Sequence, residues 1–186
     1  MKNRMKRFDE AVLFSVQRSQ NRTLSILMMT FSLVGNGGLL WALIGGLLLL
    51  DPSTARCGVY LIVSLSLCAL VNNIVLKSLC ARERPCDTYR NVPLLIKRPI
   101  GSSFPSGHTA TSFASATALF LLDPRIGVLA LFIAFIIAFS RLYLFVHYPS
   151  DILFGILSGV ALSLAAIQIV RAFFHFVPIA YFAVIV

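Results

Sequence analysis

Long apolar runs separated by short polar segments are the feature that most restricts how this chain can fold. The runs cover residues 24–50, 57–79, 108–122, 126–146, 151–170 and 173–186. A helix of about 20 apolar residues crosses the ~30 Å hydrocarbon core of a bilayer. Because lipid supplies no hydrogen-bond partners for the backbone, such runs fold as helices. We therefore expect an all-α integral membrane protein, a bundle of six transmembrane helices that forms one domain over residues 1–186.

The distribution of charge agrees with a membrane protein. Only 12% of the residues are charged, against about 25% in an average soluble domain. The formal net charge is +9, but the basic residues flank the apolar runs, which favours anionic lipid headgroups over nucleic acid as their partner. No cleavable signal peptide is evident, because the basic N-terminus leads into a mixed segment without a short apolar core.

Residues 1–23 form a basic segment ahead of the first apolar run. Their apolar residues Phe8, Ala11, Val12 and Val16 recur at roughly helical spacing, which is typical of a helix that lies in the membrane interface. A solvated, positively charged flank is the equally weighted alternative. We expect a short interfacial helix here.

The cysteines indicate no metal site. Cys57, Cys68, Cys80 and Cys86 contain no C-x-x-C pair, so the sequence predicts no structural zinc. Cys57 and Cys68 lie in or beside an apolar run and are interpreted as small buried hydrophobes. Cys80 and Cys86 bracket part of a polar loop, where a disulfide and free thiols both stay open.

The number of runs assigns each polar segment to one side of the membrane. Two crossings return the catalytic loop 80–107 to the side of the N-terminus, and the hairpin of the third and fourth runs returns residues 140–151 to that side. We therefore expect the polar residues near these run ends to meet at one membrane face. They are Lys77, Arg84, Ser106, His108, Arg141, His147 and Asp151.

Taken alone, each of these residues has an ordinary explanation. Lys77 and Arg141 at run ends are typical of snorkelling side chains, and a histidine such as His108 in a first helical turn is often a polar cap. The segment Pro105-Ser106-Gly107-His108 indicates more. It places free backbone N–H groups at a helix N-terminus, where anions bind.

His147 and Asp151 have the spacing that brings two side chains together on one helix face, although Pro149 makes a turn into the next helix the alternative. A carboxylate beside one imidazole nitrogen orients the ring and makes the other nitrogen a better nucleophile. With the cations and helix N–H groups, this set predicts metal-free phosphoryl transfer. One histidine attacks phosphorus and the other protonates the leaving oxygen.

At this point the chain resembles the membrane branch of the type 2 phosphatidic acid phosphatase superfamily, the lipid phosphate phosphatases. The first signature segment is matched by Lys77, six further residues and Arg84-Pro85. The second is matched by Pro105-Ser106-Gly107-His108. The third is matched by Ser140-Arg141, five residues, His147, three residues and Asp151.

The resemblance implies a role for most of these residues. His147 would be the nucleophile that forms a phosphohistidine, Asp151 would orient it, and His108 would be the general acid. The phosphate would be held by Lys77, Arg84, Ser106, Gly107 and Arg141. Ser140, Pro85 and Pro105 belong to the signature without an assigned role. No metal and no other cofactor is implied.

The resemblance also implies a lipid phosphate substrate. Undecaprenyl diphosphate, phosphatidate, phosphatidylglycerol phosphate and lipid A phosphate all stay open, as does the oligomeric state. A transporter or scaffold that keeps a phosphate-binding site is the non-enzymatic alternative. Transporters usually carry ionisable groups within their spans, and the first, third and fifth runs have almost none. A vanadate haloperoxidase can share these residues but not the membrane architecture.

Two indications conflict on which membrane face carries the site. Bacterial members of the family usually work on the outer face of the inner membrane. Outside the signatures, ten basic residues fall on the side of the site and three on the other, so the positive-inside rule favours a cytoplasmic site in the bacterial inner membrane. The ten are Lys2, Arg4, Lys6, Arg7, Arg18, Arg22, Arg82, Arg90, Lys97 and Arg98, and the three are Arg56, Arg125 and Arg171.

Overall fold

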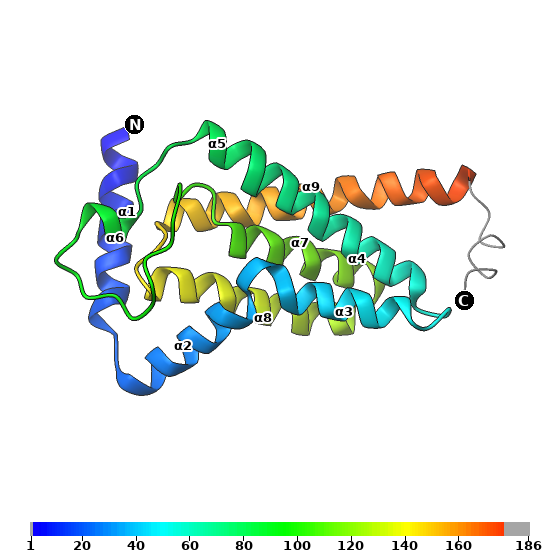
Figure 1. Cartoon of the computed structure of the whole chain (residues 1–186), viewed down its shortest axis with the longest axis horizontal. Coiled ribbons are helices and arrows are strands. Elements are labelled where there is room, and N and C mark those ends of the chain that lie inside the picture. The colour runs from blue at the N-terminus through cyan, green and yellow to red at the C-terminus, as the bar shows by residue number, and fades with distance from the viewer. Residues whose placement is uncertain (1, 177–186) are drawn as a thin grey trace.

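A computed structural model describes residues 2–176, and every regular element in this range is a helix. The elements are α1 (Lys2–Arg18), α2 (Arg22–Val34), η1 (Asn36–Gly38), α3 (Leu39–Leu49), α4 (Ala55–Cys68), η2 (Ala69–Leu76), α5 (Lys77–Leu79), α6 (Pro85–Thr88), α7 (Gly107–Leu122), α8 (Pro124–Tyr143) and α9 (Pro149–Phe176). Figure 1 shows α3, α4, α7, α8 and α9 running along the long axis, with α1 across one end. The all-α expectation is confirmed for the described residues.

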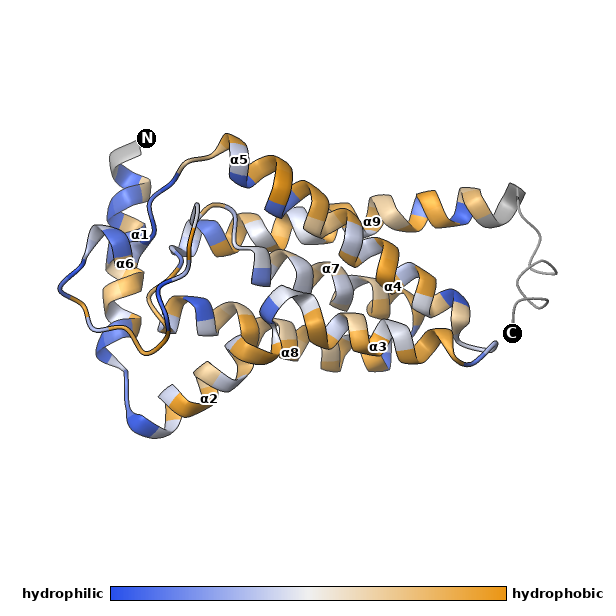
Figure 2. Ribbon diagram, viewed as in Figure 1, coloured by the Kyte–Doolittle hydropathy of each residue, from blue (hydrophilic) through white to orange (hydrophobic). Residues whose placement is uncertain are grey.

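The bundle is apolar on its outside and small or polar at its centre. Large side chains such as Leu129, Phe132 and Phe135 of α8 are exposed, whereas α7 buries Ser112 and Ser115 among its alanines. Figure 2 accordingly shows orange along the outer helices and a paler α7 between them. This arrangement suits a lipid environment, because lipid tails solvate the outer side chains and small residues let helices approach closely.

The helices long and apolar enough to cross a membrane are fewer than the six predicted. Within residues 2–176, three continuous stretches qualify, namely Ala55–Leu79, Pro124–Tyr143 and Pro149–Phe173. A fourth qualifies if the bent pair Arg22–Val34 and Asn36–Leu49 is one span. The predicted third span, α7, has 16 residues, about 24 Å at 1.5 Å per residue, and is enclosed by α4, α8 and α9 rather than by lipid.

The first apolar run, predicted as one span over residues 24–50, is a helix broken near its middle. Its two halves meet at 43° around the sequence Gly35-Asn36-Gly37-Gly38. Gly38 has a φ of +74°, which glycine adopts without strain, and a β-carbon there would lie 2.8 Å from Leu65. The break therefore brings the chain against α4 and leaves Asn36 and Gly37 facing the polar end of α7.

Helices α7 and α9 pack through glycine. A β-carbon on Gly159 would lie 2.4 Å from the carbonyl oxygen of Ala110, and one on Gly155 would lie 3.0 Å from that of Ser106. These two glycines form a G-x-x-x-G pair, a spacing typical of close helix packing. This contact brings the start of α7 beside the start of α9.

The predicted boundary between the fifth and sixth runs is absent. Helix α9 continues through residues 171–172 to Phe176, because no proline or glycine interrupts it there. The rest of the predicted sixth span, residues 177–186, lies outside the described residues. At the other end of the chain, α1 is helical as predicted, while its location in the membrane interface stays a prediction.

Candidate active site

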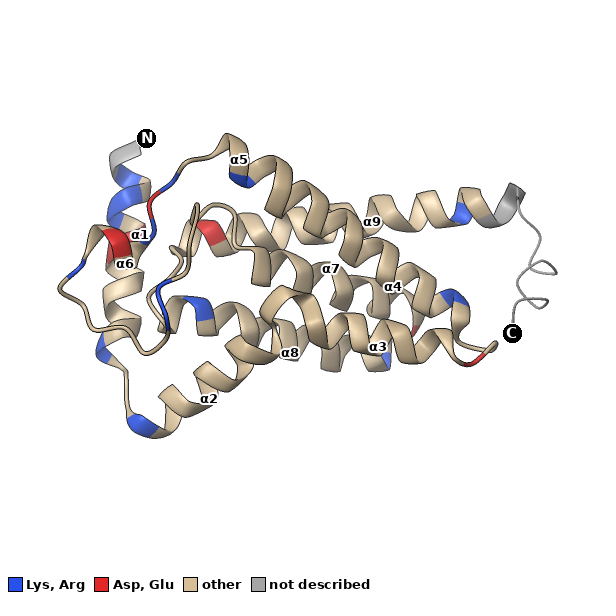
Figure 3. Ribbon diagram, viewed as in Figure 1, with Lys and Arg blue, Asp and Glu red and all other residues tan. Residues whose placement is uncertain are grey.

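The polar residues singled out in the sequence come from helix ends at one end of the bundle. Figure 3 shows the blue and red segments gathered near α1, α6 and the adjacent starts and ends of the long helices. Lys77 begins α5, Arg84 precedes α6, His108 lies in the first turn of α7, Arg141 in the last turn of α8, and Asp151 in the first turn of α9. His147 lies in the turn between α8 and α9. The structure thus brings them together.

His147 is buried, with its two ring nitrogens facing opposite charges. Its Nε2 lies 3.2 Å from the Nη1 of Arg84, and its Nδ1 lies 3.6 Å from the Oδ2 of Asp151. Because a guanidinium can only donate, Nε2 must be the acceptor and the proton of the neutral ring resides on Nδ1. This tautomer directs the lone pair of Nε2 away from Asp151, which is the orientation that a nucleophile needs.

The surroundings of His147 keep its ring neutral. Burial, followed by the charges of Arg141, Arg84 and Lys77, lowers the pKa of His147 well below its ordinary value. A protonated imidazole has no free lone pair, so this environment preserves a nucleophilic nitrogen at neutral pH.

Asp151 is fully buried and its carboxylate is held on two sides. Its Oδ2 accepts from the backbone N–H of Tyr148 at 2.8 Å, and its Oδ1 accepts from Arg82 at 2.6 Å. A carboxylate in the first turn of α9 is also favoured by the dipole of that helix. Both carboxylate oxygens of Asp151 are therefore fixed in position next to His147.

Arg84 links the loop that precedes α7 to the turn that carries His147. Its guanidinium donates to the carbonyl oxygens of Gly101, Ser102 and Val146 at 3.0, 3.1 and 3.2 Å, in addition to its contact with His147. The side chain is 3% exposed. A guanidinium fixed in this way is a preorganised charge that need not reorient during a reaction.

Arg141 is buried with part of its hydrogen-bonding capacity unused. One Nη donates to the hydroxyl of Ser32, while its Nε has no protein partner among the described residues. Buried donors are normally paired. The unpaired Nε, in a cluster that also contains Lys77 and Arg84, indicates a place for an anion.

The start of α7 supplies backbone donors to the same region. The hydroxyl of Ser106, the residue before the helix, contacts Thr109 Oγ1 at 2.9 Å and does not cap the helix. Gly107 and His108 line a cavity of about 200 Å³ with Lys77 and Asn73. Since a liquid water occupies about 30 Å³, this cavity has room for a phosphate group. The uncapped N-terminus favours such an anion.

Gly107 is packed against the side chain of Asn73. A β-carbon there would lie 2.3 Å from the Oδ1 of Asn73, in the π-helical segment η2. The next residue, His108, is close enough to Lys77, Arg141 and His147 to interact with their charges. The two histidines therefore share one cationic neighbourhood.

Comparison with known proteins agrees with this geometry. Residues 58–175 match the PAP2 superfamily. The chain belongs to this superfamily. An undecaprenyl-diphosphatase of Sulfolobus acidocaldarius is 32% identical over 83% of this chain and 74% of its own length. A lipid A 1-phosphatase of Rhizobium johnstonii is 33% identical over 58% of this chain and 45% of its own length.

A solved structure agrees in fold with this PAP2 protein. The crystal structure of the first transmembrane PAP2 type phosphatidylglycerolphosphate phosphatase from Bacillus subtilis superposes with a TM-score of 0.75 over 94% of this chain and 88% of that one. At 24% identity, this likeness concerns the fold alone. The resemblance to the membrane lipid phosphatases inferred from three short segments is confirmed.

Three signature residues of this PAP2 chain have structural surroundings of their own. The hydroxyl of Ser140 donates to the carbonyl of Ile137 within α8 at 2.6 Å. Pro85 begins α6, a position that suits proline because no N–H is needed there. Pro105 is buried ahead of α7. These surroundings indicate that the three residues fix the course of the backbone around the site.

Two further residues of the PAP2 site were not predicted from the sequence. Arg82, interpreted as one of the basic flanking residues, contacts Asp151 directly. Asp9, in the basic N-terminal segment, contacts Arg82. The available signal was a pair of adjacent acids, Asp9 and Glu10, among the basic residues of α1. That signal carried no information on its distant partner.

All four cysteines are free thiols, which decides the alternative left open for Cys80 and Cys86. Cys86 is buried and Cys80 is partly exposed. The described residues include no cluster of three or more histidine, cysteine or acidic side chains arranged to hold a metal ion.

Proposed function

We propose that the protein hydrolyses the phosphate monoester or diphosphate of a membrane lipid through a phosphohistidine intermediate. The observation that carries this proposal is the position of His147 between Arg84 and Asp151. Its Nε2 is 3.2 Å from a fixed cation and its Nδ1 is 3.6 Å from a buried carboxylate. A phosphate bound by the cations would present phosphorus to the lone pair of Nε2, in place of the contact from Arg84.

In the first step, Nε2 of His147 attacks phosphorus, and the bond from phosphorus to the leaving oxygen breaks. The negative charge of the bound phosphate among the cations allows His108 to take up a proton, and His108 gives this proton to that oxygen, releasing a lipid alcohol from a monoester or a lipid monophosphate from a diphosphate. As the imidazole gains positive charge, its Nδ1–H closes on Asp151, and the 3.6 Å gap shortens to a hydrogen bond. Lys77, Arg84, Arg141, the hydroxyl of Ser106 and the backbone N–H of Gly107 stabilise the charge on the equatorial oxygens.

In the second step, water attacks the phosphorus of the phosphohistidine and the P–N bond breaks. His108, now neutral, accepts the proton of the water, and inorganic phosphate leaves. Both histidines return to their starting states, so the cycle balances. We propose that no metal is required, because the protein's own cations supply the charge that a metal ion would otherwise provide.

For the substrate, we propose a polyprenyl diphosphate ahead of the other lipid phosphates. The support is the undecaprenyl-diphosphatase of Sulfolobus acidocaldarius, whose similarity extends over most of both chains. The similarity to the lipid A 1-phosphatase is more local.

The test is phosphate release by the purified protein in mixed micelles with EDTA present. The panel contains undecaprenyl diphosphate, phosphatidate, phosphatidylglycerol phosphate and lipid A. We expect release in EDTA, fastest from the diphosphate, and a ³²P-labelled protein after rapid quenching whose label is stable to base and lost in acid. Absence of release from every lipid would refute the proposal and favour the transporter or scaffold.

We also propose that the site faces the cytoplasm, on the ten-to-three distribution of basic residues. The measurement is labelling by a membrane-impermeant thiol reagent in intact cells. A variant whose single cysteine is Cys80 should react only after permeabilisation. A matched variant whose single cysteine replaces the exposed Arg125, at the opposite end of the bundle, should react at once. The reverse pattern would place the site outside.

A further inference from the structure

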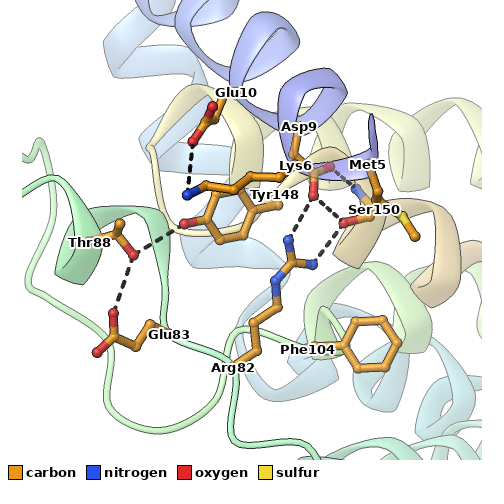
Figure 4. Close-up of a pocket in the computed structure, with 10 residues that line it drawn as sticks. All are labelled: Met5, Lys6, Asp9, Glu10, Arg82, Glu83, Thr88, Phe104, Tyr148 and Ser150. Carbon is orange, nitrogen blue, oxygen red and sulfur yellow. Dashed lines mark hydrogen bonds and ion pairs between the residues drawn. The ribbon is translucent and has the colours of Figure 1, made fainter. Parts of the chain in front are cut away.

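A chain of ionic contacts joins the N-terminal helix to the candidate active site, and Figure 4 shows its first link, between Asp9 and Arg82. The Nη2 of Arg82 lies 2.7 Å from Asp9 of α1, and its Nη1 lies 2.6 Å from Asp151 of α9. Both carboxylates are almost fully buried, at 1% and 0% exposure. Isolated surface ion pairs contribute little, but two buried acids that share one guanidinium are a fixed part of the structure.

Asp9 also holds the start of α9. Its Oδ1 accepts from the backbone N–H of Ser150 at 2.9 Å, and its Oδ2 accepts from the Ser150 hydroxyl at 2.6 Å. Free N–H groups in a first helical turn require such acceptors. Asp9 therefore caps α9 from another helix, one residue before Asp151.

Arg82 has further contacts besides the two carboxylates. Its guanidinium lies 4.3 Å from the centre of the Tyr148 ring, and its backbone pairs with the hydroxyl of Ser102 and the N–H of Ser103. On the side away from Asp151, Arg82 lines a cavity of about 590 Å³ between α1 and the loops. Arg82 therefore lies between this cavity and the buried carboxylate of Asp151.

The charges in this chain do not cancel. One guanidinium serves two carboxylates, so the group formed by Asp9, Arg82 and Asp151 carries a net negative charge. If Asp9 were absent, Arg82 would pair with Asp151 alone and neutralise it. A neutralised Asp151 would stabilise a developing imidazolium less well.

We propose that Asp9 and Arg82 are positioning residues for Asp151, which set its orientation and leave it enough negative charge to act on His147. This inference rests on the role proposed above for His147. It makes α1 a part of the catalytic unit, because the acid that maintains the charge comes from that helix.

The charged groups around His147 influence its protonation and therefore the pH dependence of kcat/KM. Five titratable or charged groups face it, one from each neighbouring segment. They are Asp151 from α9, Arg84 from the loop, Arg141 from α8, Lys77 from α5 and His108 from α7. Since none of them is altered in the variants below, a shift in the acid limb of kcat/KM reports the change at Asp9 or Arg82.

The two substitutions are expected to move the acid limb in opposite directions. Asp9→Asn removes a negative charge, so protonating His147 becomes harder and the limb moves to lower pH. Arg82→Gln removes a positive charge and moves it to higher pH. We expect shifts of about half to one pH unit, with kcat about 10-fold lower in both variants. A purely structural role would lower activity in both without opposite shifts.

Controls are available at neighbouring residues. Glu10→Gln removes the same charge from the next residue of α1, whose carboxylate contacts Tyr89 and Lys6 instead of Arg82, and should leave the profile in place. Asp9→Glu keeps the charge. It should restore part of kcat and return the acid limb of the kcat/KM profile to the pH found in the parent protein. If Asp9→Asn fails to fold, Arg82→Gln still tests the proposal. A shift of its acid limb to higher pH supports the positioning role, and an unshifted limb overturns it.

The outcomes separate the two proposals. Opposite shifts, with Glu10→Gln unshifted, support the positioning role. Unshifted limbs in Asp9→Asn and Arg82→Gln, or shifts in one direction, overturn it, provided that His147→Ala is inactive in the same assay. An active His147→Ala would overturn the proposed function itself.

Discussion

Replacement of His147 by alanine is expected to abolish hydrolysis of lipid phosphates, with kcat reduced by about 10⁴-fold or more. The substitution removes the only nitrogen that is both close to the cation cluster and backed by a buried carboxylate within residues 2–176. No other described side chain at the site offers a neutral nucleophile oriented in this way. The measurement is single-turnover phosphate release together with trapping of the ³²P-labelled protein.

The His147→Ala variant should still bind phosphate. Lys77, Arg84 and Arg141 remain, and the ring that separates Arg84 from Asp151 is replaced by a small side chain. Retained binding of inorganic phosphate, measured by calorimetry in detergent, would show that the loss lies in chemistry rather than in folding. Turnover close to the parental rate, or an undiminished ³²P label, would contradict the mechanism.

The second large effect is expected for Arg84→Lys, which keeps the charge and removes the planar fork. Arg84 uses its nitrogens on three carbonyl oxygens and on His147, and a single ammonium group cannot reproduce that set. We expect kcat/KM to fall by about 10²- to 10³-fold, the range found when a preorganised donor to a transition state is lost.

Arg90→Lys is the matched control for this prediction. Arg90 lies in the same loop, is exposed, and its Nε donates to the carbonyl of Asp87 at 3.3 Å. Its substitution should change kcat/KM by less than about twofold, because exposed contacts of this kind contribute little. Equal effects of the two substitutions would mean that Arg84 acts only as a distant charge.

The sequence allowed the class of fold and the grouping of the candidate residues to be predicted for a physical reason. Helices are obligatory in lipid, so counting runs brings Lys77, His108, Arg141 and Asp151 to one end. The break at Gly38 was not predicted, because a glycine in an apolar run fits a close helix contact as well as a left-handed turn. The continuity of α9 was missed for a related reason, since hydropathy does not define where a helix ends.

The contacts of Asp9 illustrate what a local pattern cannot provide. Its partner Ser150 is 141 residues away in the sequence, and nothing near Asp9 distinguishes it from its neighbour Glu10. Burial of an acid in a basic helix follows from how α1 lies across the bundle, which depends on packing contacts such as those of Leu13. Such information exists only in the folded chain.

The glycine contacts between α7 and α9 have a consequence for how substrate preference can diverge. A backbone N–H to carbonyl bond of 3.3 Å from Ser106 to Asp151 joins the two helix starts, and Gly155 and Gly159 leave no clearance for sliding. The groups that act on phosphorus therefore share one rigid frame. Variation in the lipid that is accepted should then accumulate outside the starts of α7 and α9, where the chain can change without moving His108 or Asp151.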